Sequence, residues 1–343
     1  MKNVEKLTVI VPSFNRQKLA LNTLNNWSKL NINVHLVDGS EKPIESSRLS
    51  HLSKNIKYHH VKIISEIDRI KNILNLINTK YCILGADDDL LLPNALSKCV
   101  NFLEKNNDFS SCFGQVLSFM HHSNQNKFYE NKLNLKNFTL QSENKEKRLR
   151  KYALKPVPFC ILSVMRTNIF KKLFDITNPT QISFYANLEL RASILVPYFG
   201  KSMAISNLIL LRNKDNAPIT NRNRSNTSLF KFLLYNNKRK ERDLFISSLI
   251  KLLDKEEQEG EKIIKKTLFY HLFFSIYRIL TIKIFNIIIY NINFLHMLKK
   301  RKKIKSLVSL EDLQSFCEKK QIQLDEEDLN FIKEKFNNKT TIK

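Results

Sequence analysis

The chain has 343 residues, of which 43% are hydrophobic, and a formal net charge of +25. The length allows one large domain or two ordinary ones, and the hydrophobic content is that of a soluble globular protein. A sequence pI of about 9.8 fits nucleic acid, anionic lipid or a phosphate-bearing substrate as partner. An uncharged apolar stretch of about 18 residues is absent, which argues against a membrane span.

The beginning of the chain and its cysteines indicate a compartment. Residues 1–6 lead directly into a short apolar run rather than a signal-peptide core, so we expect that the protein is not exported. Five cysteines, an odd number without Cys-x-x-Cys spacing, are typical of small buried side chains in a reducing compartment. We therefore expect a cytoplasmic protein.

The first hundred residues alternate between strand-like and helix-like patterns. Short β-branched and apolar runs predict strands at 7–11, 34–37, 56–64 and 81–86. Apolar residues at near-helical spacing predict helices at 17–30, 67–78 and 93–105. This alternation predicts an α/β fold with a mostly parallel sheet flanked by helices.

Polar segments follow three of these strands, at 12–16, 38–40 and 87–89. Ligands of open parallel sheets bind at the carboxyl ends of the strands. We therefore expect the three segments to converge on one cleft.

Beyond residue 108 the pattern is looser. It predicts strands at 112–119 and 159–166, a polar surface excursion at 121–147 and a short helix at 187–195. After about residue 225 the chain becomes helical and contains no proline. These changes predict a first domain over residues 1–220 and a C-terminal helical region over residues 225–343.

Three adjacent carboxylates, Asp87, Asp88 and Asp89, follow the strand at 81–86 and precede a helix that begins near Pro93. Like charges this close repel one another unless a cation lies among them. A hard divalent metal, which can also carry a substrate's phosphates, is one explanation. An acidic loop that caps the next helix is the other. The residues alone leave both open.

Together, the strand-end motifs resemble those of glycosyltransferase family 2, a group of GT-A fold enzymes that use nucleotide-sugars. Residues 9–16 are similar to the opening of the family, residues 37–40 to its second motif, and residues 81–93 to its aspartate motif, here in a triple-Asp form that resembles a bacterial subgroup. Val37 stands where the second motif has its first Asp, and Ala86 where many relatives have an Asp. The resemblance implies a GT-A-like, Rossmann-type sheet.

The resemblance also implies roles for side chains at the strand ends. It implies that Phe14 flanks the nucleotide base, that Asp38 accepts from a ring N–H and that Asp87 contacts ribose. Asp88 and Asp89 would hold manganese or magnesium on the diphosphate. The further residues of the nucleotide-sugar site are Pro12, Arg16, Arg69 and Lys71.

The residues themselves leave alternatives open at several of these positions. Phe14 also fits ordinary packing, and Asp38 fits a turn in which it bonds its own backbone. Arg69 and Lys71 equally fit the solvated face of a helix. Asp89 equally fits a cap of the helix that follows it.

The family inverts configuration by direct displacement, which requires one base to deprotonate the acceptor hydroxyl. The order of the motifs indicates Glu189 as this base, at the start of the helix predicted at 187–195. Arg191 matches a basic position of some relatives, whereas the usual Glu-Asp pair is absent because Leu188 and Leu190 flank the acid. A carboxylate on the helix surface is the alternative.

Residues 267–305 combine an apolar helical pattern with a basic end at 299–305. This pattern fits an interfacial helix on an anionic membrane surface. It also fits a central helix of a helical subdomain, whose basic end suits the helix dipole, or a nucleic-acid contact.

We therefore expect a metal-dependent inverting glycosyltransferase. It would move a sugar from a nucleoside diphosphate-sugar to a hydroxyl of a saccharide or lipid-linked saccharide in bacterial surface glycan assembly. The donor that we expect is a UDP-sugar. The expected setting is the inner face of the cytoplasmic membrane, with residues 267–305 as a peripheral contact and no nucleic-acid partner. The alternatives are a catalytically silent GT-A-fold binding protein and a basic nucleic-acid-binding protein.

Overall fold

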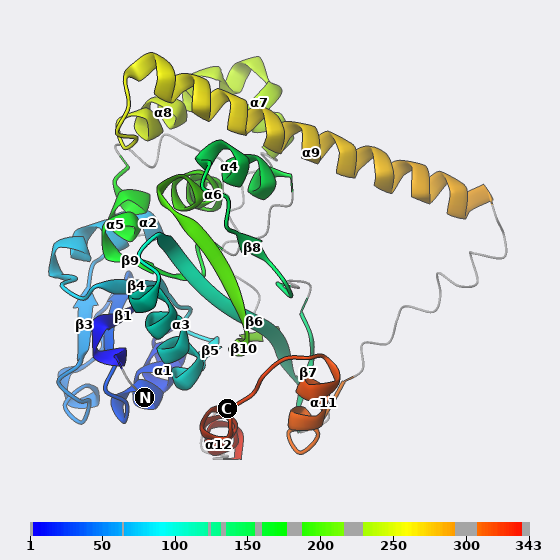
Figure 1. The fold of residues 1–343 in the computed structure, drawn as a ribbon. Helices are drawn as coiled ribbons and strands as arrows, with labels where there is room; N and C mark the ends of the chain where they lie inside the picture. The colour runs from blue at the N-terminus through cyan, green and yellow to red at the C-terminus, as the bar shows by residue number, and fades with distance from the viewer. Residues whose placement is uncertain are drawn as a thin grey trace.

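The computed structural model describes residues 3–63, 65–122, 125–131, 135–154, 160–176, 187–215, 229–291 and 307–337. Within these residues the chain forms a ten-stranded sheet with the order β3-β2-β1-β4-β9-β6-β10-β5, with β7 beside β6 and β8 beside β10 (Figure 1). The strands are β1 (Leu7–Ser13), β2 (Asn33–Asp38), β3 (Ile56–His60), β4 (Tyr81–Leu84), β5 (Leu90–Leu91), β6 (Phe109–His122), β7 (Gln125–Glu130), β8 (Thr139–Leu140), β9 (Val164–Arg166) and β10 (Lys201–Asn213).

Helices flank this sheet and dominate the chain after residue 229. The α-helices are α1 (Gln17–Ser28), α2 (Glu66–Ile73), α3 (Pro93–Lys105), α4 (Lys145–Ala153), α5 (Thr167–Phe174), α6 (Asn187–Phe199), α7 (Leu229–Leu234), α8 (Arg239–Ile250), α9 (Glu257–Asn291), α11 (Leu313–Lys319) and α12 (Glu326–Asn337). None of the helices among the described residues is both long enough and apolar enough to cross a membrane.

The first four strands form the parallel part of the sheet that the sequence predicts. β1 pairs in parallel with β2 and β4, and β2 pairs in parallel with β3. The β-branched run Val9, Ile10 and Val11 is buried because strands lie on both sides of β1 and helices cover the sheet. β1 continues beyond its predicted end to Ser13, past the point at Ile10 where its pairing with β4 stops. The predicted fold class is confirmed.

The middle of the chain contains more strands and helices than its polar sequence indicates. β6 and β10 pair in parallel over most of their length, while β9 joins β4 to β6 with antiparallel pairing on both sides. The surface excursion predicted at 121–147 is wrong, because β7, β8 and the start of α4 lie in it. Phe128 of β7 is fully buried and pairs with Phe119 of β6, which gives this strand an apolar anchor.

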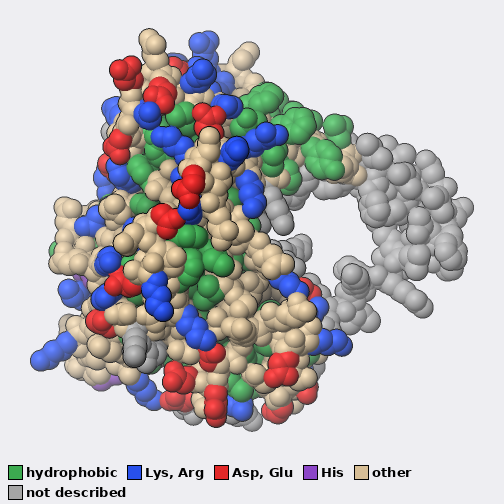
Figure 2. Space-filling view, viewed as in Figure 1, with side chains coloured by type: hydrophobic (Ala, Val, Ile, Leu, Met, Phe, Trp, Pro, Cys, Tyr) green, Lys and Arg blue, Asp and Glu red, His purple; other side chains and the backbone are tan. Residues whose placement is uncertain are grey.

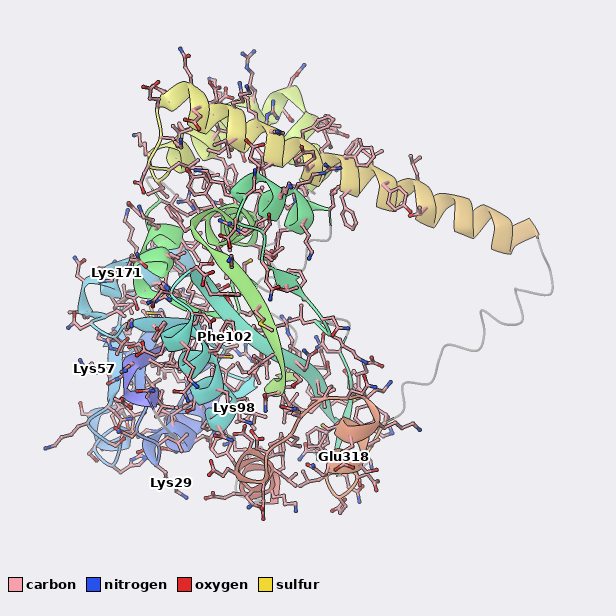
Figure 3. The ribbon with its side chains drawn as sticks, in the orientation of Figure 1. Lys29, Lys57, Lys98, Phe102, Lys171 and Glu318 are labelled. Atoms are coloured by element: carbon pink, nitrogen blue, oxygen red, sulfur yellow. The ribbon has the colours of Figure 1, made fainter. Side chains whose placement is uncertain are left out.

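The last part of the chain lies at two ends of the molecule. In Figure 1, α7, α8 and α9 lie together beyond α4 and α6, whereas α11 and α12 lie at the other end, near β7. The ring of Phe336 in α12 packs edge-on against Phe119 and Phe128, at centroid distances of 5.0 and 5.4 Å. Lys98 of α3, labelled in Figure 3, forms an ion pair of 2.7 Å with Asp325. The end of the chain is thereby packed against the sheet and α3.

Candidate active site

The ends of β1, β2 and β4 meet through direct hydrogen bonds. The Gly39 N–H donates to the Ser13 carbonyl at 2.9 Å, which joins the ends of β1 and β2. The Ser13 hydroxyl donates to Asp87 at 2.9 Å, which joins β1 to the segment after β4. The Asn15 N–H donates to the Ser40 hydroxyl at 2.9 Å. The expected convergence of the three segments is confirmed.

Two backbone features permit this close approach. Asn15 has a φ of 55°, in the left-handed region that asparagine tolerates, and it turns the chain from β1 into α1. A Cβ at Gly39 would lie 2.6 Å from the Cδ of Arg69 and 2.6 Å from the Ile63 carbonyl oxygen. Only glycine therefore allows Arg69 to pack against the end of β2.

The guanidinium of Arg16 lies between two of the three aspartates. Its Nη1 is 3.0 Å from Asp87 Oδ1, and its Nη2 forms an ion pair with Asp88. Burial raises the pKa of Asp87 to about 6, although Arg16 and the Ser13 hydroxyl act in the opposite direction. The cation expected among the three carboxylates is thus, for Asp87 and Asp88, a side chain of the protein.

Asp89 faces a different part of the molecule. Its Oδ1 accepts a hydrogen bond of 2.9 Å from the Asn213 N–H at the end of β10. Burial and the neighbouring charge of Asp88 raise the pKa of Asp89 to about 7. No side chain of the preceding segment caps α3; its Asn94 and Ala95 N–H groups donate to Asp328 instead. The alternative in which Asp89 caps α3 is therefore wrong.

Asp88 and Asp89 have the chemistry of a divalent metal site. Magnesium and manganese prefer oxygen ligands, and magnesium is often held by one or two carboxylates with substrate phosphates as further ligands. The upward shift in the pKa of Asp89 shows that a cation beside the pair would relieve burial and repulsion. Among the described residues, no group of three or more His, Cys, Asp or Glu could hold a metal. Asp88 and Asp89 alone offer two carboxylates, which is fewer ligands than a complete metal site needs.

Asp38 is fully buried, and its carboxylate is saturated with hydrogen bonds. Oδ1 accepts from the N–H and the hydroxyl of Ser40, and Oδ2 accepts from Gln17 at 3.0 Å and from the Tyr58 hydroxyl at 2.9 Å. Burial acts upward, yet these bonds hold the pKa of Asp38 below its usual value. A carboxylate has about four acceptor positions, so a base N–H could bond Asp38 only if one of these partners left.

Arg69 is only 4% exposed, so the alternative that places it on a solvated helix face is wrong. Its Nη1 donates to the Ile63 carbonyl at 2.8 Å, and its guanidinium lies 5.6 Å from the centroid of the half-buried Phe14 ring. Lys71, by contrast, is exposed, and its Nζ donates to the Ile176 carbonyl at 2.9 Å, which ties α2 to the chain after α5. Pro12 is half-buried on β1, opposite Val37.

Glu189 is exposed in the first turn of α6, and its charge reaches the cluster through Glu66. Burial raises the pKa of Glu66, Arg69 opposes this shift, and the charges of Glu189 and Asp87 add to it. Glu66 therefore interacts electrostatically with both the predicted base and Asp87. Residues 184–186, which precede α6, lie outside the described residues.

Arg191 has no place in this cluster. It is fully buried, and its guanidinium donates to the Leu173 carbonyl at 3.1 Å and to the Ser248 hydroxyl at 2.7 Å. It also donates to the carbonyls of Lys172 and Asp175, so it caps the end of α5. In this structure Arg191 therefore ties the end of α5 to α6 and α8.

Several side chains of the cluster carry no sequence signal of their own. Tyr58 reaches Asp38 because β3 pairs with β2, and Glu66 lies near Asp87 because α2 packs on β1. Ser13 and Ser40 do lie inside the recognised motifs. A cavity of about 480 Å³ elsewhere, between β6, β10 and residues 320–322, includes none of the predicted site residues.

Comparisons with known proteins match the part of the chain that contains these strand ends. The model of the family described as glycosyl transferase family 2 matches residues 8–174. No curated protein matches the chain by sequence. The structure of residues 1–349 of TarS from S. aureus superposes with a TM-score of 0.51 and 15% identity, over 78% of this chain and 72% of that one, which shows a shared fold.

Two further TarS structures are similar at lower scores. A longer TarS chain has a TM-score of 0.49 and 15% identity over 77% of this chain and 43% of that one. TarS 1–349 in complex with UDP-GlcNAc has a TM-score of 0.48 and 13% identity over 77% of this chain and 72% of that one.

Proposed function

Residues 8–174 belong to glycosyltransferase family 2, so the protein is a glycosyltransferase, and we propose that it transfers a sugar from a nucleoside diphosphate-sugar with inversion of configuration. The observation that carries this proposal is the meeting of the β1, β2 and β4 ends around Asp87, with Arg16 and Arg69 among the carboxylates. Such an edge offers oxygen ligands and cations side by side, which suits a phosphate-bearing substrate.

The donor would lie across the three strand ends. Phe14 would offer a flat apolar face for a base, and Asp87 would contact the ribose. Asp88 and Asp89 would hold manganese or magnesium, which supplies positive charge for the leaving diphosphate. We propose that Asp38 acts on the base chiefly through the loop it holds, because its acceptor positions are used by Gln17, Ser40 and Tyr58.

The acceptor hydroxyl would attack the anomeric carbon from the side opposite the leaving group. We propose that Glu189 is the base that removes the proton of this hydroxyl. Its exposed carboxylate lies in the first turn of α6. Glu66 supports the assignment, since the charges of Glu189 and Asp87 both repel it, so both carboxylates lie within electrostatic range of the same side chain. Because the Glu189 carboxylate is exposed, an acceptor can reach it from solvent.

We propose a saccharide or a lipid-linked saccharide as acceptor and the inner face of the cytoplasmic membrane as the place of work. The net charge of +25 supports both a phosphate-bearing donor and an anionic surface. The sugar transferred is decided by side chains around the cleft rather than by the fold.

Calorimetry with UDP, with and without manganese, tests the donor site. Asp88→Asn and Asp89→Asn should each weaken manganese-dependent UDP binding by at least about tenfold, because each removes a charged ligand. Asp254→Asn, a change at an exposed aspartate without a role in the site, should bind as the wild type does. Unchanged binding in both site variants would show that the metal lies elsewhere.

A further inference from the structure

Helix α9 carries apolar side chains on two opposite faces. One face packs against α4, α7 and α8, where Ile264, Leu268 and His271 are buried. The other face is open to solvent along three turns. A helix that is apolar all round is normally covered all round, so the open face lacks the cover that its composition requires.

The open face consists of large side chains with much of their surface exposed. Their positions follow the pattern i, i+4, i+7, i+8 and i+11, which places them on one side of the helix. They are Phe269 (61% exposed), Phe273 (56%), Ile276 (36%), Tyr277 (58%) and Leu280 (52%). Figure 1 shows α9 extending past the rest of the molecule, and Figure 2 shows hydrophobic side chains gathered on this projecting part.

Cations border this apolar face. Lys262 and Lys266 lie seven residues before Phe269 and Phe273, hence on the same side of α9, and both are exposed. Lys266 also forms an ion pair of 2.7 Å with Glu146, in which both side chains are about half exposed. In the sequence, five consecutive basic residues follow the helix at 299–303. Apolar and aromatic side chains beside lysines are the composition of a helix that lies in the interface of an anionic membrane.

We propose that the open face of α9, formed by Phe269, Phe273, Ile276, Tyr277 and Leu280, docks on the surface of an anionic lipid bilayer. The helix lies along the bilayer plane, with its rings among the acyl chains and Lys262 and Lys266 at the headgroups. A second copy of the chain is the other occupant of matching shape, and it would bring another net charge of +25 against the first. The proposal concerns attachment and does not depend on glycosyl transfer.

Vesicle flotation of the full chain tests the proposal, with vesicles of phosphatidylcholine alone and of phosphatidylcholine with phosphatidylglycerol. The double variant Phe273→Ser, Tyr277→Ser removes two exposed rings without touching the packed face. Tyr235→Ser, Leu244→Ser is the matched control, since these side chains are 46% and 43% exposed elsewhere on the helical region.

The wild type and the control should float with the anionic vesicles, and the double variant should bind them at least about tenfold more weakly. High salt should weaken the wild-type binding further. Equal flotation of the two double variants, or no preference of the wild type for anionic vesicles, would overturn the proposal. So would a wild-type dimer, seen by light scattering, that the Phe273→Ser, Tyr277→Ser variant dissociates.

Discussion

Arg16 determines the electrostatic state of the aspartates. It forms an ion pair with Asp87 and another with Asp88, while Asp89 accepts a hydrogen bond from an N–H group of β10. The carboxylate with the least direct compensation is therefore Asp89, whose pKa burial and Asp88 raise to about 7. A metal bound by Asp88 and Asp89 would supply the positive charge that Asp89 does not receive from Arg16.

Glu189→Gln tests the proposed base at the scale of one residue. The amide keeps the size of the side chain but cannot accept the acceptor's proton, so kcat should fall by about 10²- to 10⁴-fold while UDP-sugar affinity is retained. Turnover is measured with a UDP-sugar that the wild type uses as donor, and affinity is measured by calorimetry.

Glu327→Gln makes the same change in the first turn of another helix, α12, and should leave kcat unchanged. Retained turnover in Glu189→Gln would remove Glu189 as the base. Donor binding without turnover in the wild type would favour a catalytically silent protein.

At the scale of elements, the helix after the aspartates depends on the far end of the chain. Leu92, before α3, has no side-chain oxygen to offer its first turn. Asp328 of α12 supplies both oxygens, accepting from Asn94 N–H at 2.9 Å and Ala95 N–H at 3.0 Å. A carboxylate at this position also interacts favourably with the helix dipole.

Asp328→Ala should lower the free energy of unfolding by about 1–3 kcal/mol, because it leaves two N–H groups without their partner in a buried place. Urea denaturation of the whole chain measures this loss. Glu326→Ala, at an exposed neighbour in the same turn, should change stability by less than about 0.5 kcal/mol. An equal loss in the two variants would mean that the cap contributes nothing.

At the scale of the whole molecule, buried histidines make stability depend on pH. His271 of α9 is 2% exposed, lies 3.1 Å from the Ser193 hydroxyl of α6, and has its pKa lowered by burial from 6.5 to about 4. Between these two pH values, His271 is protonated in the unfolded chain but stays neutral in the folded chain. The contribution of His271 to stability is therefore complete above pH 6.5 and is lost as the pH drops toward 4.

His271→Gln should remove this part of the acid sensitivity, which amounts to at most about 3 kcal/mol. The measurement is the free energy of unfolding in urea across this pH range. His122→Gln, at an exposed histidine, should keep the wild-type slope. Burial and the nearby His59 also lower the pKa of His35 to about 4. Part of the dependence of stability on pH therefore remains in every variant.

Local patterns predicted much of this molecule. The strand and helix periods of the first hundred residues, and the order of the strand-end motifs, placed Arg16, Asp38 and Asp87 near one edge of a sheet. These features depend on neighbours in sequence, and a run such as Val9 to Val11 has few ways to bury itself other than as a central strand. Lys71 and Arg191 show what residue type and spacing leave out: in the structure Lys71 bonds the Ile176 carbonyl beyond α5, and Arg191 bonds carbonyls at the end of α5.

The sequence by itself determined the sheet, the motifs and the presence of three repelling carboxylates. Only the tertiary structure decided that Arg16 lies between two of them, that Gln17 and Tyr58 fill the second oxygen of Asp38, and that α3 is capped from α12. The reason is separation along the chain: the Asp328 carboxylate is 233 and 234 residues from the N–H groups it binds. The periodicity of a sequence indicates which face of a helix or strand a residue lies on. It does not indicate a hydrogen-bond partner more than 200 residues away, because that contact depends on how the elements pack.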